Sequence, residues 1–146
     1  MSNEMQTGQC LCGAVRFRFR LPNRALQACH CQQCQRWTGG SPLIGARVEG
    51  TEITGEENIE RYHASDFGER AFCRVCGTTL FWKMQDGPVD FLCAGLLNDQ
   101  SGLEMKEEIF TDRRACWLRP WKDANQSTEA EEFAKLDAWM AEQQGE

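Results

Sequence analysis

Seven of the nine cysteines in this 146-residue chain fall into three tight clusters, and these clusters constrain the fold more than any other feature of the sequence. Tetrahedral zinc with Zn–S bonds of about 2.3 Å needs its sulfurs roughly 3.7 Å apart, and cysteines one or two residues apart can meet that need. One pair alone would be weak evidence, whereas three clusters together predict zinc coordination. The clusters are a C-x-C pair (Cys10, Cys12), a C-x-C-x-x-C run (Cys29, Cys31, Cys34) and a C-x-x-C pair (Cys73, Cys76).

The seven cysteines can divide in more than one way. Two pairs make a closed four-thiolate site, the usual arrangement of structural zinc, so Cys10, Cys12, Cys73 and Cys76 would hold one ion. The remaining run of Cys29, Cys31 and Cys34 would then hold a second ion with one open position, as catalytic zinc sites do.

The two histidines and the two remaining cysteines need separate interpretations. His30 lies between two ligands that share a face, so we expect its ring to point away from the ion. His63 is expected to be an ordinary strand residue. Cys93 follows apolar residues and Cys116 precedes a tryptophan, so both are predicted to be small core residues.

The surroundings of the cysteines favour metal over disulfides. Residues 1–9 are polar and lack an apolar signal stretch, and no run is long enough to span a membrane, so we expect a cytoplasmic protein. Disulfides are disfavoured in such a reducing compartment, and a bridge within C-x-C would be strained. A thioredoxin-like C-x-x-C needs a βαβ setting, which this pattern lacks.

Short strands separated by turn residues predict an all-β fold of antiparallel sheets. In residues 14–20, Val15, Phe17 and Phe19 alternate with arginines, which places the apolar side chains on one face of a strand. Residues 29–37 lack this period and predict a loop with one helical turn. Further strands are expected at residues 43–48, 59–63, 78–83, 89–94 and 103–110.

The C-terminal residues form a distinct segment. Thr128 followed by Glu131 matches a capping box, and the apolar residues after it predict an amphipathic helix that packs back on its own domain. The whole chain has a net charge of −6. Residues 122–146 hold two lysines and seven acidic residues, a net charge of −5, so the rest of the chain is nearly neutral. We therefore expect a zinc-binding domain over 1–121 and an acidic helical tail over 122–146, with no basic face for nucleic acid.

Three motifs in order resemble the glutathione-dependent formaldehyde-activating enzyme family, whose domain is shared with centromere protein V. The likeness covers about residues 6–120. The motifs are GQCLCGAVRF at residues 8–17, CHCQQCQR at 29–36 and FCRVCGT at 72–78. The resemblance implies a fold similar to the Mss4-like fold with a zinc-ribbon-like element. It also implies a structural zinc on the two pairs and a second, substrate-facing zinc on Cys29, Cys31 and Cys34.

The resemblance further implies an enzyme that joins a small thiol such as glutathione to a small aldehyde such as formaldehyde, a carbon–sulfur lyase similar to S-(hydroxymethyl)glutathione synthase. Cys29, Cys31 and Cys34 would serve catalysis as ligands of the open zinc. Arg36 and Trp37 directly follow this run and are candidates to contact the substrate, since arginine grips carboxylates with paired hydrogen bonds. The alternative function is a non-catalytic zinc module that acts as a protein-interaction scaffold or a thiol carrier. Chromatin binding is disfavoured by the acidic balance.

Overall fold

The computed structural model describes residues 4–145, and these residues separate into two compact units. Of these residues, the first unit comprises 4–26 and 44–104, and the second comprises 27–43 and 105–145. The prediction of a zinc-binding domain over 1–121 with a separate tail stays a prediction. Both units are built mainly of short strands, and the expected all-β fold with one long C-terminal helix is confirmed.

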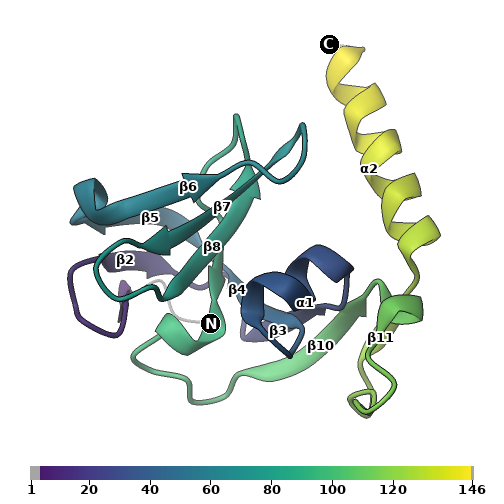
Figure 1. Cartoon of the computed structure of the whole chain (residues 1–146), viewed down its shortest axis with the longest axis horizontal. Helices are drawn as coiled ribbons and strands as arrows, with labels where there is room; N and C mark the ends of the chain where they lie inside the picture. Colours follow the sequence, from purple (N-terminus) through teal and green to yellow (C-terminus); the bar gives the residue numbers. More distant parts are fainter. Residues whose placement is uncertain (1–3, 146) are drawn as a thin grey trace. The chain divides into compact units, whose positions relative to one another are not determined.

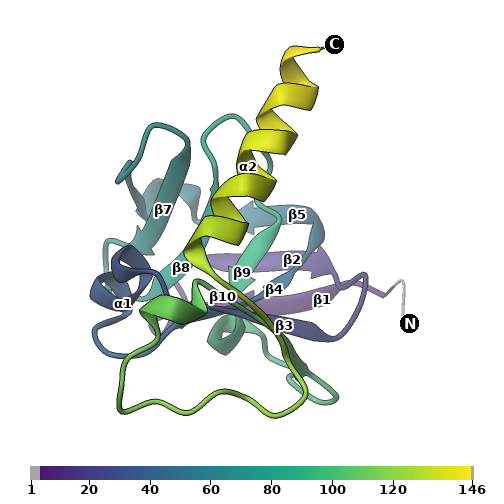
Figure 2. The same ribbon diagram turned by 90° about the vertical axis from the view of Figure 1, so that its right-hand side faces the viewer.

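The first unit contains a three-stranded sheet in which β2 lies between β1 and β5 (Figure 2). Both pairings are antiparallel, and Phe17 of β2 lies opposite Gly8 on one side and Ile53 on the other. Burial along β2 alternates as the sequence predicts, because Phe17 and Phe19 are buried and the three arginines face outward. The strands are β1 (Gln6–Gln9), β2 (Arg16–Arg20) and β5 (Glu49–Thr54).

A second run of strands in this unit has the order β4-β9-β8-β7-β6, and Figure 1 shows β6, β7 and β8 side by side. The two sheets meet through aromatic side chains, because Phe17 packs edge-to-face on Phe81 of β8 with ring centroids 6.3 Å apart. The elements are β4 (Leu43–Arg47), η1 (Glu56–Asn58), β6 (Ile59–Tyr62), β7 (Gly68–Cys73), β8 (Thr79–Met84), β9 (Phe91–Cys93) and η2 (Ala94–Leu96).

A buried carboxylate connects the neighbouring strands β6, β7 and β8 of this unit. Glu69 of β7 is buried, and it accepts hydrogen bonds from Arg61 at 2.5 Å and from His63 at 3.0 Å. Lys83 of β8 lies 3.7 Å away and donates to three backbone carbonyls of the turn that follows. His63, expected as an ordinary strand residue, comes directly after β6 and takes part in this network.

The second unit is built around β10, which lies between β11 and β3. Residues 32–38 form two turns of helix rather than the predicted loop with one turn, because Cys31 caps the first turn and Gly39 ends the helix in a left-handed conformation with φ 88°. The elements are β3 (Ala25–Cys29), α1 (Gln32–Thr38), β10 (Glu104–Ile109), η3 (Thr111–Arg113), β11 (Asn125–Ser127) and α2 (Glu129–Gln144).

Helix α2 begins at the predicted place, since Thr128 and Glu131 form a complete capping box. The expected packing of its apolar side chains on the domain holds only for Phe133: no residue of α2 is buried, and Phe133 and Trp139 are 43% and 45% exposed. The first two turns are anchored by contacts that include Phe133 packing edge-to-face on Phe110 and Arg113 binding Glu129. Within residues 4–145, no helix combines the length and apolar character needed to cross a membrane.

Candidate metal centres

Four cysteines of the first unit converge on one point although two of them precede β2, one ends β7 and one follows it. The sulfurs of Cys10, Cys12, Cys73 and Cys76 all lie within 4.8 Å of one another. The Sγ atoms of Cys10 and Cys12 are 3.7 Å apart, and those of Cys12 and Cys73 are 3.9 Å apart. These separations match the edge of about 3.7 Å expected for a tetrahedral zinc thiolate site, so the donor set fits a zinc ion.

Two similar turns present these sulfurs. In the first turn the N–H of Gly13 donates to the carbonyl of Cys10, and in the second the N–H of Gly77 donates to the carbonyl of Cys73. Each glycine has φ 81°, a left-handed conformation that other residues adopt only with strain. The glycine after each pair is therefore what allows the backbone to turn around a shared ion, an arrangement compatible with a zinc-ribbon-like element.

Thr78 links the two turns. Its Oγ1 accepts a hydrogen bond from the N–H of Leu11 at 3.1 Å and lies 3.1 Å from the sulfur of Cys76. This hydrogen bond to the sulfur, with further backbone hydrogen bonds that outweigh partial desolvation, lowers the pKa of Cys76 to about 5. In the pair Cys73 and Cys76, the side chain of Cys76 is therefore available as a thiolate at neutral pH.

The three remaining clustered cysteines lie together in the second unit. Cys29 ends β3, Cys31 caps helix α1, and Cys34 lies in the first turn of that helix. Their sulfurs lie within 4.8 Å of one another, and the sulfur of Cys31 accepts a hydrogen bond from the N–H of Cys34 at 3.3 Å. Within residues 4–145, no histidine, aspartate, glutamate or further cysteine joins this group.

The crowding of three sulfurs has an electrostatic consequence. The neighbouring thiols of Cys31 and Cys34, together with burial, raise the pKa of Cys29 far above that of an ordinary thiol. Three thiolates cannot share so small a space without a compensating positive charge. The donor set therefore suits a divalent cation that prefers sulfur, with three protein ligands.

His30 is held on a separate network, as expected of a residue between two ligands. Its imidazole is 1% exposed, and its Nε2 lies 2.7 Å from a carboxylate oxygen of Glu108. Glu108 is fully buried and also accepts hydrogen bonds from Arg114, from Gln126 and from the backbone N–H of Trp121. No sequence signal distinguishes Glu108 from its acidic neighbours in β10, and its role emerges only from the fold.

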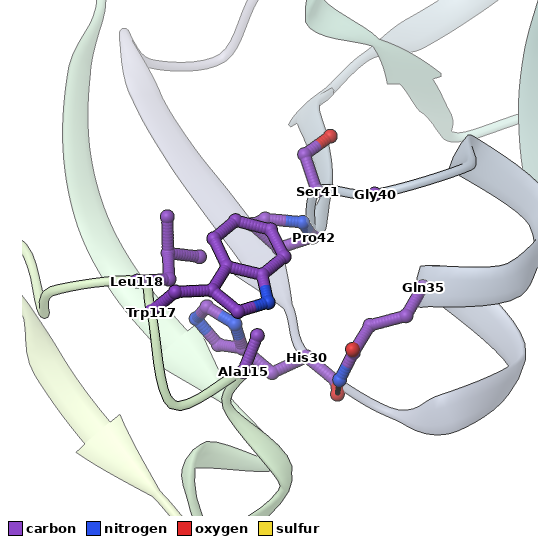
Figure 3. Close-up of a pocket in the computed structure, with 8 residues that line it drawn as sticks. All are labelled: His30, Gln35, Gly40, Ser41, Pro42, Ala115, Trp117 and Leu118. Atoms are coloured by element: carbon purple, nitrogen blue, oxygen red, sulfur yellow. Dashed lines mark hydrogen bonds between the residues drawn. The ribbon is translucent and has the colours of Figure 1, made fainter.

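A small pocket adjoins this network. It is lined by residues of α1 and the loop after it and by residues 115–118, with His30 at its base (Figure 3). In Figure 3 the indole of Trp117 lies beside the imidazole of His30. The lining residues are His30, Gln35, Gly40, Ser41, Pro42, Ala115, Trp117 and Leu118.

The remaining candidates have mixed outcomes. Cys93 is buried in β9, as predicted, whereas Cys116 is exposed and the prediction that it is a core residue is wrong. Its neighbour Trp117 is 66% exposed, so the aromatic residue that suggested a core position does not occupy one. Arg36 is exposed at the end of α1 and Trp37 is half-buried, and neither lines the pocket. Their role as substrate contacts stays a prediction.

Comparison with known proteins gives a consistent result. The chain is 32% identical over 80 residues to a Schizosaccharomyces pombe protein named as an uncharacterised lyase, a match that covers 55% of this chain and 58% of that protein. It is 31% identical over 83 residues to a Halomonas elongata protein named as a candidate glutathione-dependent formaldehyde-activating enzyme, covering 51% and 53%. The chain thus spans little more than half the length of these curated relatives.

A solved structure supports the fold. The crystal structure of a Rhodobacter sphaeroides protein, 25% identical in sequence, superposes with a TM-score of 0.52 over 67% of this chain and 90% of that one. The model of the family described as glutathione-dependent formaldehyde-activating enzyme matches residues 5–113, which include all seven clustered cysteines. The chain therefore belongs to the glutathione-dependent formaldehyde-activating enzyme family.

Proposed function

We propose that this protein binds two zinc ions and uses the second to catalyse the addition of a small thiol to a small aldehyde, or the reverse carbon–sulfur cleavage. Glutathione and formaldehyde are the substrates that the family description and the name of the Halomonas elongata relative support. The ion held by Cys10, Cys12, Cys73 and Cys76 is structural in this proposal. The carbon–sulfur lyase class agrees with the word lyase in the name of the Schizosaccharomyces pombe relative.

One observation carries the proposal: Cys29, Cys31 and Cys34 form a compact group of three sulfurs that no fourth ligand side chain within residues 4–145 completes. A zinc ion bound by three protein ligands can accept an external thiol and lower the pKa of that thiol. The three cysteines hold the negative charge that such an ion needs, and the buried His30–Glu108 pair fixes the segment between them.

The reaction balances without any further reactant. The sulfur of the thiol forms a bond to the aldehyde carbon, and the π electrons of the carbonyl group move to its oxygen. That oxygen gains a proton equivalent to the one the thiol gave up. Carbon–sulfur cleavage reverses each of these changes.

Recognition of a glutathione-like substrate also needs positive charge for its carboxylates. Arg36 is exposed on α1 two residues after Cys34, and its guanidinium can grip a carboxylate with two parallel hydrogen bonds. Trp37 offers an aromatic surface beside it. We propose both as substrate contacts, and an Arg36→Ala variant should weaken glutathione binding without loss of metal.

Cobalt substitution tests the proposal. Cobalt(II) takes the place of zinc at cysteine sites and absorbs visible light according to its ligands. Glutathione added to the cobalt-loaded protein should change the visible spectrum, because only a site with an open position can take up the added thiol. An unchanged spectrum would favour the alternative, a non-catalytic zinc module.

Two matched variants separate the roles of the ions. Cys31→Ser should lose one metal equivalent and the spectral response to glutathione while circular dichroism stays unchanged. Cys73→Ser should lose the fold of the first unit, because Cys73 is fully buried and joins the two cysteine turns. Equal loss of structure in both variants would refute this division of roles.

A further inference from the structure

The C-terminal half of α2 is exposed on all sides and carries large apolar side chains. Every residue from 137 to 145 is exposed, and Trp139 and Met140 are 45% and 38% exposed. This half leads away from β10 and β11, the neighbouring strands of its own unit (Figure 1, Figure 2). A helical segment of this length is marginal in water without tertiary packing, so a partner that covers Trp139 and Met140 would stabilise it.

The same half of α2 is negatively charged. It contains Asp137 and Glu142, and the one basic residue of the helix, Lys135, precedes it and binds Glu132. At 3.6 residues per turn, Asp137 and Glu142 flank the two exposed apolar side chains on opposite sides. The last turn has no basic residue to offset the negative end of the helix dipole. The partner surface should therefore combine apolar side chains with positive charge.

Exposed apolar side chains also lie on the two cysteine turns of the first unit, residues 10–13 and 73–77. Leu11 of the first turn is 85% exposed, and Val75 of the second is 61% exposed. The two turns are joined, because the N–H of Leu11 donates to Oγ1 of Thr78 directly after the second turn and because the four sulfurs converge. Leu11 and Val75 therefore belong to one surface.

Positive charge borders this surface on both turns. Arg16 is exposed and lies over the first turn, where its Nε donates to the carbonyl of Gly13 at 3.1 Å. Arg74 directly precedes Val75 and is 52% exposed, with the carboxylate of Glu60 at 3.2 Å. An ion pair this exposed is weak, so the guanidinium of Arg74 can bind a second carboxylate. The cysteine turns thus have the apolar and basic character that α2 lacks a partner for.

We infer that this protein forms a dimer in which α2 of each copy docks on the cysteine turns of the other copy. Trp139 and Met140 of one copy cover Leu11 and Val75 of the other, and the acidic side chains of the helix face the arginines that border the turns. Reciprocal docking gives two identical contacts related by a two-fold axis, so the assembly closes at two copies. The contact uses none of residues 29–37 and is independent of the proposed function.

Charge distinguishes this arrangement from pairing of α2 with α2. The helix holds five acidic residues and one lysine, a net charge of −4, so two such helices repel each other. Docking on the cysteine turns instead brings carboxylates next to arginines.

Sedimentation equilibrium of the zinc-loaded chain tests the dimer. Losing one packed aromatic side chain weakens a contact about tenfold, and the dimer has two such contacts, so Trp139→Ala should raise the dimer Kd about a hundredfold. Trp117→Ala, at a 66% exposed side chain that belongs to neither surface, should dimerise as the wild type does. A wild-type chain that stays monomeric, or equal Kd values for the two variants, would overturn the inference.

A second pair of variants tests the cysteine turns. Leu11→Ser should also weaken dimerisation, whereas Tyr62→Ser, at a 63% exposed side chain of β6, should not. Metal analysis checks that the zinc content is unchanged, and Val75→Ser takes the place of Leu11→Ser if zinc is lost. Wild-type dimerisation of the turn variant together with weak dimerisation of Trp139→Ala would indicate that α2 pairs with α2, and would refute docking on the turns.

Mixing the two defective variants tests whether Trp139 and Leu11 meet. Each homodimer carries a substitution in both contacts, whereas a mixed dimer of Trp139→Ala and Leu11→Ser has both substitutions in one contact and keeps the other intact. If the two side chains share a contact, the mixed dimer should be about tenfold tighter than either homodimer. Native mass spectrometry measures the populations, and no preference for the mixed dimer would overturn the pairing.

Salt tests the contribution of charge. Raising the salt concentration from about 0.05 M to about 0.5 M should weaken the dimer several-fold, because salt screens the attraction between carboxylates and arginines. Arg16→Gln should reduce this dependence. A dimer that tightens as salt is added would refute the role of the arginines.

Discussion

Replacing Glu108 with glutamine should destabilise the second unit by about 3–5 kcal/mol, although glutamine has nearly the same size. The two carboxylate oxygens accept from four donors: His30, Arg114, Gln126 and the N–H of Trp121. Glutamine has one oxygen and one NH₂ group, so two of these donors would face another donor. Each lost hydrogen bond to a charged group is worth about 1.5–3 kcal/mol, and breaking a buried ion pair costs about 3–5 kcal/mol.

Urea unfolding of the zinc-loaded chain at constant excess zinc, followed by circular dichroism, measures this difference. A matched control is Glu107→Gln, since Glu107 is the half-buried neighbour in β10 and contacts only Gln27 among the hydrogen bonds described for it. Its effect should stay below about 1 kcal/mol. A similarly small effect for Glu108→Gln would refute the reasoning that all four partners act as donors.

The same comparison predicts a pH dependence. The pKa of Glu108 is lower in the folded protein than in the unfolded chain, so its contribution to stability is present above the unfolded value and is lost as pH falls through the folded value. The difference in unfolding free energy between wild type and Glu108→Gln should therefore shrink as pH falls below about 4.3. A difference that stays constant down to the acid transition would contradict this assignment.

Three further predictions concern the first unit and α2. Gly77→Ala should lower stability by about 1–2 kcal/mol in thermal denaturation, because φ is 81° there and the added methyl group meets no atom within 4 Å, so backbone strain alone acts; an unchanged melting temperature would contradict this. In the metal-free protein Cys76 should react rapidly with an aromatic disulfide reagent down to about pH 5. Thr78→Val should slow that reaction at pH 6, because the variant loses the hydrogen bond that lowers the pKa of Cys76. Equal reaction rates in wild type and variant would refute the role of Thr78. Phe133→Ala should reduce the helical circular dichroism signal, since it removes an edge-to-face contact with Phe110 worth about 1 kcal/mol, and an undiminished signal would show that α2 needs no such anchor.

Local patterns predicted the features that depend on neighbouring residues. Alternation over residues 14–20 identified β2, the capping box at Thr128 identified the start of α2, and close spacing identified the three cysteine clusters. In each case the geometry is determined within a few residues: by the period of the side chains, by the helix cap, or by the short spacing that lets neighbouring sulfurs bind one ion. The resemblance to the family then fixed how the seven cysteines divide.

Features that depend on distant partners could not be predicted in this way. Strand β5 contains Gly50, which predicts a turn, yet Ile53 pairs with Phe17 of β2 and completes a sheet. Glu108 follows another glutamate in an acidic strand, and nothing local indicates that four donors from elsewhere in the unit surround it. Cys116 has an apolar neighbour but lies on an exposed loop, because the position of that loop is set by tertiary contacts.

The two cysteine groups differ in how much chain separates their members, and this difference bears on how the protein acquires its ions during synthesis. Cys29, Cys31 and Cys34 lie within six residues, so the ribosome need release only this short stretch before an ion can be captured. Cys12 and Cys73 are 61 residues apart, and closing so long a loop requires the intervening strands first. We expect the group of Cys29, Cys31 and Cys34 to bind its ion early in synthesis. The group of Cys10, Cys12, Cys73 and Cys76 should bind its ion last, after the strands between these cysteines have folded.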